Sequence, residues 1–204
     1  MSDLDRIIKF ILNWVGLDGP FPSKQTPLSS TSDALRKLDA LFGAFWDEPP
    51  YPFKPNKIDH NRKRGLFAVQ DYIINPRKLE PNADGHLRLV SENQGVWYFS
   101  YDKQNRLYFC GDWFVGDIAS SDIATAFPAE IEDVLCFALL GNFFSYVDGT
   151  DWRDIFSPED IWPEDITVKL WDHAAWSPYK GFWTNKDGSA LLYDGVGFFR
   201  RSTK

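Results

Sequence analysis

The sequence has few of the residues from which many functional sites are built. Its 204 residues include two cysteines and three histidines, and 29 Asp and Glu residues exceed the 22 Lys and Arg residues. The net charge of −7 argues against nucleic acid as a direct ligand, because phosphate binding needs a surface of Lys and Arg. The first apolar stretch is interrupted by Asp3, Asp5, Arg6 and Lys9, so it fits neither a signal peptide nor a membrane span. We therefore expect a cytoplasmic protein that contacts no membrane.

Motifs for cofactors and catalysis are also missing. There is no G-x-x-x-x-G-K-[ST] or G-x-G-x-x-G loop for phosphates and no G-x-S-x-G nucleophile elbow. His60, His86 and His173 lie far apart, so we predict no metal site and no cofactor. Cys110 and Cys136 lie in apolar stretches, which favours buried reduced thiols over a disulfide. Carboxylates are numerous enough for acid–base catalysis, but no pair is singled out, and we predict that the protein is not an enzyme.

Charge is distributed unevenly along the chain. Between Asp112 and Asp165 thirteen acids accompany one base, Arg153, which gives this acidic segment a charge of −12. The remaining 16 acids and 21 bases carry +5, partly in a basic run from Lys54 to Arg64. One interpretation is an acidic face that meets a basic partner and steers its approach. The other is that both runs are solvated surface that folding interleaves.

The N-terminal region predicts an amphipathic helix followed by a linker. Apolar residues from Leu4 to Val15 recur at helical spacing, Ser2 or Asp3 can cap the start, and Gly16 ends the helix. Residues 16–30 are rich in Gly, Pro and Ser, which is typical of a linker that lets the first helix dock or swing. We therefore divide the chain into residues 1–30, the helix and linker, and residues 31–204, the main domain.

The main domain mixes helical and strand patterns. A helix is predicted after the cluster Ser29–Ser32, and two more over residues 120–127 and 128–142. The last helix has acids Glu130, Glu132 and Asp133 near its positive end, a wholly apolar run from Val134 to Leu140 that should be deeply buried, and Gly141-Asn142 available as a cap. Alternating patterns predict strands over residues 87–90, 96–101, 106–110, 180–184, 190–193 and 197–200.

These elements indicate the fold class. The first three strands are separated by short turns, so a meander is the simplest pairing. A content of 44% hydrophobic and 17% aromatic residues is sufficient to build one core. We expect an α+β protein, a largely antiparallel sheet flanked by helices in a single domain.

The segment Asp84–Trp97, with the sequence DGHLRLVSENQGVW, resembles the SUKH superfamily of bacterial immunity proteins. Members of this family often place a strand before Glu-Asn-Gln-Gly and an aromatic strand after it. The resemblance covers about residues 31 to 200, and the chain departs from the pattern in its basic loop at 54–65 and its aromatic segment at 171–183. It implies a SUKH-like fold and a non-enzymatic protein that binds a cognate toxin and blocks its active site.

The motif of this family is interpreted as structural. Asn93 and Gly95 tolerate positive φ in a tight turn, Glu92 and Gln94 can bond exposed backbone, and Trp97 enters the sheet.

A toxin-binding surface is sought instead in the acidic segment. Trp152 and Trp162 are candidate anchors within a charged rim, although core packing explains them equally well. The rim consists of Asp148, Asp151, Asp154, Glu159, Asp160, Glu164 and Asp165. A nuclease toxin, with its basic cleft, would suit such a surface. The alternative is a sugar-binding or glycan-acting domain, in which Trp171, Trp176 and Trp183 stack on a sugar that carboxylates bond.

Overall fold

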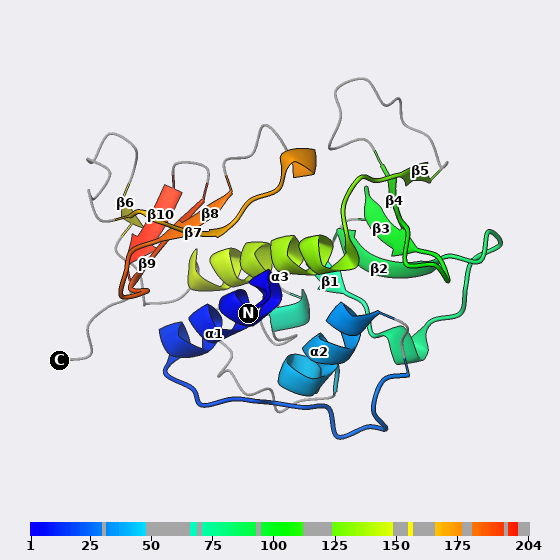
Figure 1. Ribbon diagram of the computed structural model, residues 1–204, viewed down its shortest axis with the longest axis horizontal. Helices are drawn as coiled ribbons and strands as arrows, with labels where there is room; N and C mark the ends of the chain where they lie inside the picture. The colour runs from blue at the N-terminus through cyan, green and yellow to red at the C-terminus, as the bar shows by residue number, and fades with distance from the viewer. Residues whose placement is uncertain are drawn as a thin grey trace.

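A long helix, α3 (Ile131–Asp148), lies at the centre of the computed structural model. Helices α1 (Asp3–Val15) and α2 (Asp33–Phe42) lie along one side of it and two antiparallel sheets along the other (Figure 1). The structure describes residues 1–29, 32–47, 66–68, 71–92, 95–111, 124–148, 155–156, 166–176, 181–193 and 196–199. Within these ranges no helix has the length and apolar character needed to cross a membrane.

Helix α1 has the bounds that its sequence predicts. Ser2 caps the start reciprocally: the backbone N–H of Asp5 donates to Ser2 Oγ at 3.4 Å, and the backbone N–H of Ser2 donates to Asp5 Oδ2 at 3.0 Å. Gly16 ends the helix in the left-handed conformation, with φ of 67°. The buried side chains of α1, among them Leu4 and Ile7, belong to the same hydrophobic cluster as those of α3. The first helix therefore docks on its own chain.

The segment after α1 is tied down at several points. The N–H of Phe21 donates to the carbonyl of Leu41 at 2.7 Å, and the N–H of Leu28 donates to Asp39 Oδ2 at 3.1 Å. Arg77, from the short helix η4 (Pro76–Lys78), donates to the carbonyl of Thr26 and also pairs with Asp39 at 2.6 Å. In this structure, residues 17–29 serve as a strap across α2 rather than as a hinge.

The first sheet is a meander of five strands, β1 (Asp71–Ile73), β2 (Leu87–Glu92), β3 (Tyr98–Tyr101), β4 (Leu107–Cys110) and β5 (Thr125–Ala126), paired in that order. The predicted three-strand meander is confirmed as β2–β4. The helix predicted over residues 120–127 is wrong at 125–126, which pair with β4. Pairing with β4 determines the conformation of these two residues, and Pro128 disfavours the helical conformation at Phe127, which precedes it.

The second sheet is also antiparallel, with strand order β6-β10-β9-β8-β7. Its strands β8 (Phe182–Thr184), β9 (Ala190–Tyr193) and β10 (Val196–Phe199) are the three that the sequence predicts. Two outer strands, β6 (Ile155–Phe156) and β7 (Val168–Trp171), were not predicted. The two meanders with their helices confirm the α+β class and the single domain.

The middle of helix α3 is buried on every side, as its apolar run predicts, and all residues from Val134 to Leu140 are at most 5% exposed. The predicted cap at Gly141-Asn142 is wrong, because the helix continues to Asp148. Asn142 is wholly buried and its side chain bonds β1 instead. The N–H of Asp71 donates to Asn142 Oδ1 at 2.8 Å, and Asn142 Nδ2 donates to the carbonyl of Asp71 at 2.9 Å.

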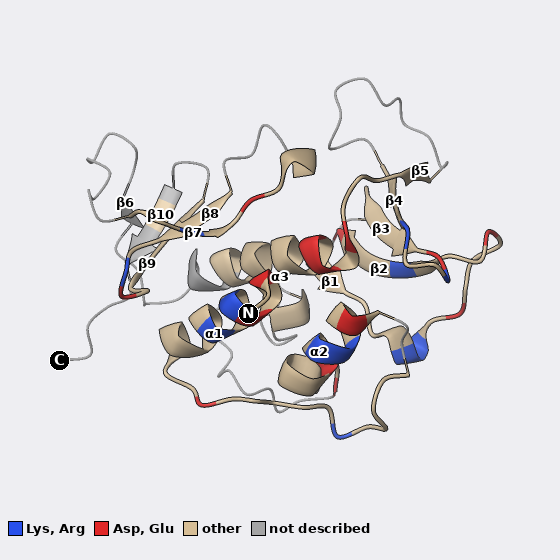
Figure 2. Cartoon of the chain, viewed as in Figure 1, with Lys and Arg blue, Asp and Glu red and all other residues tan. Residues whose placement is uncertain are grey.

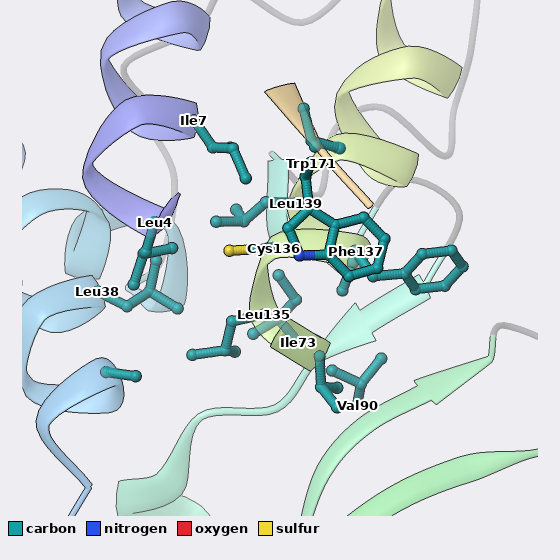
Figure 3. Packing of buried hydrophobic residues seen from close by; sticks show 14 of the residues in the cluster. Leu4, Ile7, Leu38, Ile73, Val90, Leu135, Cys136, Phe137, Leu139 and Trp171 are labelled. Carbon is teal, nitrogen blue, oxygen red and sulfur yellow. The ribbon is translucent and has the colours of Figure 1, made fainter. Parts of the chain in front are cut away.

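The core is built around α3 (Figure 3). Leu4 and Ile7 reach it from α1, Leu38 from α2 and Trp171 from β7, and all four are at most 2% exposed. Cys136 lies among them, and burial raises the pKa of its thiol well above its ordinary value. Both cysteines are buried and form no disulfide, which confirms that prediction.

Candidate functional site

Most of the predicted partner-binding residues lie outside the described residues. Asp148 is the last residue of α3. Asp151, Trp152, Asp154, Glu159, Asp160, Trp162, Glu164 and Asp165 fall in the ranges that are not described, so their prediction stays a prediction. The same holds for Asn93 and Gln94 of the SUKH-like motif.

The described residues of that motif form a turn between β2 and β3. The N–H of Gly95 donates to the carbonyl of Glu92 at 3.0 Å, and the N–H of Val96 donates to the Glu92 carboxylate at 3.3 Å. Gly95 has φ of 77°, a conformation that favours glycine. Trp97 is 4% exposed and packs edge-on against Phe99, with 5.7 Å between ring centroids. The two hydrogen bonds stabilise the turn, and the packing against Phe99 places Trp97 in the core.

The described part of the acidic segment opens onto a groove of about 690 Å³ at the N-terminal end of α3. One wall is the β3–β4 turn with Arg106, another the chain from Ala126 to Glu130, and Asp133 and His173 complete it. The cartoon marks acidic residues in red at this end of α3 and in the chain just before it (Figure 2). Of the acids in this segment, Glu130 and Asp133 line the groove.

Each charged group of the groove has a distinct role. Asp133 Oδ2 accepts a hydrogen bond from the N–H of Glu130 at 3.0 Å and lies 3.8 Å from His173 Nε2. His173 Nδ1 accepts from the N–H of Ala175 at 3.1 Å, so the ring of neutral His173 carries its hydrogen on Nε2, toward Asp133. Neither ring nitrogen is therefore placed to act as a general base in the groove. The pair is suited to binding and orientation.

The charge of Arg106, in the β3–β4 turn, is largely neutralised by Asp102. Its Nε donates to Asp102 Oδ2 at 2.7 Å. Burial opposes ionisation of Asp102, but hydrogen bonds from Arg106, Gln104 and Tyr108 outweigh it and lower the pKa of Asp102 to about 2. Asp102 is therefore charged at neutral pH and compensates Arg106, which leaves Glu130 and Asp133 to set a negative potential in the groove.

Glu132, the third acid near the start of α3, has a structural role. Glu132 Oε1 accepts a hydrogen bond from the N–H of Leu4 at 3.0 Å, which satisfies a backbone donor in the first turn of α1. Glu132 thus joins α1 to α3. The sequence places all three acids near the positive end of the helix, but it cannot distinguish this one from the two that line the groove.

The tryptophans of the sugar-binding alternative are mostly in the core. Trp171 and Trp176 are 2% and 1% exposed and contact each other with 5.2 Å between ring centroids. Trp183 is half-buried, with Lys169 Nζ 5.1 Å from its ring centroid. Trp171 and Trp176 therefore offer no ring face to a sugar, which removes two of the three stacking residues from that interpretation.

Within the part of the chain that the structure describes, no three His, Cys, Asp or Glu side chains are grouped so as to hold a metal ion. No family model, curated protein or solved structure matches the chain.

Proposed function

We propose that the chain is an immunity protein, a non-catalytic protein of the bacterial cytoplasm that binds a cognate toxin and neutralises it. The observation that carries this proposal is the charge of the acidic segment, thirteen acids against one base between residues 112 and 165. The resemblance of the segment Asp84–Trp97 to SUKH immunity proteins supports the same conclusion. A nuclease is the toxin class that fits best, because its nucleic-acid cleft is basic.

The groove supplies a specific way to engage such a partner. Glu130 is exposed at its edge and Asp133 lies on its wall, so a Lys or Arg side chain entering the groove would meet two carboxylates. A volume of about 690 Å³ has room for more than one side chain. Long-range attraction to the acidic segment would accelerate encounter, and the groove would fix one basic side chain after contact.

Co-expression with the protein encoded beside its gene tests the proposal. We expect a stable complex on size-exclusion chromatography and recovery of bacterial growth that the neighbouring protein alone arrests. Absence of a complex with a neighbour that is toxic would contradict the proposal. Binding on a glycan array would instead favour the sugar-binding alternative.

A further inference from the structure

Two carboxyl groups lie opposite each other at one edge of the first sheet. Among the described strands β1 pairs with β2 alone, in a register that places Asp71 opposite Glu92 and Ile73 opposite Val90. Ile73 and Val90 are 3% and 1% exposed in the core. Alternate residues of a strand share a face, so Asp71 and Glu92 lie on the core-facing side with them. Asp71 is 6% exposed.

Among the described residues, the surroundings of Asp71 offer little to stabilise a negative charge. Among the described elements, β2, α3 and the short helix η3 (Leu66–Ala68) pack against β1. β2 presents Glu92, η3 has no charged residue, and Asn142 of α3 commits its amide to hydrogen bonds with the backbone of Asp71. Burial first, and the charge of Glu92 second, raise the pKa of Asp71 to about 7.

We propose that Asp71 and Glu92 form a carboxyl pair that holds one proton in the folded protein and makes the β1 edge sensitive to pH. When Asp71 is protonated, β1 stays paired with β2. When its proton passes to solvent, two negative charges oppose each other across the strands and β1 loosens. The effect extends to the turn after β2, because Glu92 also bonds Gly95 and Val96. This inference does not depend on the proposed function.

The direction of the pH dependence follows from proton linkage. In an opened β1 the Asp71 carboxyl is solvated and titrates near 3.8, whereas in the paired strand it titrates near 7. The paired form therefore binds more protons between these values, and its advantage is lost as pH rises through this window. These two values predict an opening constant that rises about 90-fold from pH 5 to pH 8 and levels off above pH 7.

Amide hydrogen exchange measures this opening. The N–H of Ile74 donates to the carbonyl of Leu89 at 2.9 Å, so its protection factor reports the β1–β2 pairing. In the full chain we expect that factor, corrected for intrinsic exchange, to fall about 90-fold between pH 5 and pH 8. Asp71→Asn should abolish the fall, Glu92→Gln should move it to lower pH, and Glu80→Gln, at an exposed acid outside the pair, should leave it unchanged.

A direct titration keeps the test independent of whether the variants fold. The carboxyl carbon of Asp71, followed by NMR in the unmodified protein, should titrate with a midpoint near 7. A midpoint near 4 would overturn the proposal. A midpoint near 7 accompanied by pH-independent protection at Ile74 would also overturn it, because protonation of Asp71 would then not affect the opening of β1.

Discussion

The buried amide of Asn142 should contribute more to stability than any other polar side chain that the structure describes in α3. It makes two hydrogen bonds to the backbone of Asp71, at 2.8 and 2.9 Å, and is wholly buried. Asn142→Ala would leave the N–H and the carbonyl of Asp71 without that partner in a site where Asp71 is only 6% exposed. Each of the two stranded groups costs about 1–3 kcal/mol, so the expected loss in free energy of unfolding is about 2–6 kcal/mol.

Equilibrium unfolding in urea, followed by tryptophan fluorescence, measures this loss as a lower midpoint at unchanged slope. Asn142→Leu is the matched variant, because it nearly conserves the volume and so separates the hydrogen bonds from the cavity. We expect Asn142→Leu to lose about 2 kcal/mol or more, since the backbone groups remain stranded. A Leu variant as stable as the unmodified protein would refute this reasoning.

Two further predictions concern the strap and the core. Arg77→Ala should lower the free energy of unfolding by about 3–5 kcal/mol, because it leaves the buried carboxylate of Asp39 without its ion-pair partner. The control, Arg36→Ala, removes an exposed ion pair and should cost below about 1 kcal/mol. Equal losses for the two variants in urea unfolding would contradict this prediction. Cys136 should resist a thiol reagent at pH 8 in the folded protein and react in denaturant, because burial raises the pKa of the thiol well above its usual range. Mass spectrometry locates the label, and rapid native labelling of Cys136 would show that the helix opens far more often than its burial implies.

Local patterns predict an element when its own residues determine it. Ser2 and Gly16 mark both ends of α1, and the turn-formers between 87 and 110 mark the meander. The strands β5 and β6 have two residues each, too few for a periodicity, and they exist because β4 and β10 lie beside them. Asn142 shows the same dependence on distant residues. A polar residue after an apolar run indicates the end of a helix, and only the structure shows that its side chain bonds to β1.

The candidate site depends on the fold in the same way. An excess of acids between residues 112 and 165 is visible in the sequence, but the role of each acid is not. His173 lies 3.8 Å from Asp133 although 40 residues separate them along the chain, and Glu132, one residue away, contacts α1 instead. Only the packing of α3 between α1 and the connection after β7 distinguishes these two neighbouring acids.

The proposed function is tested most directly by the rate at which the chain associates with its toxin. We expect simultaneous reversal at Glu130, Asp151 and Asp154 to Lys to slow association by about 10- to 100-fold at low salt, with the difference shrinking at high salt. The matched control reverses three exposed acids outside the acidic segment, Asp18, Glu80 and Asp84, and so changes the net charge equally. If both triple variants slow association to the same extent, or neither does, the acidic segment is not the face that meets the toxin.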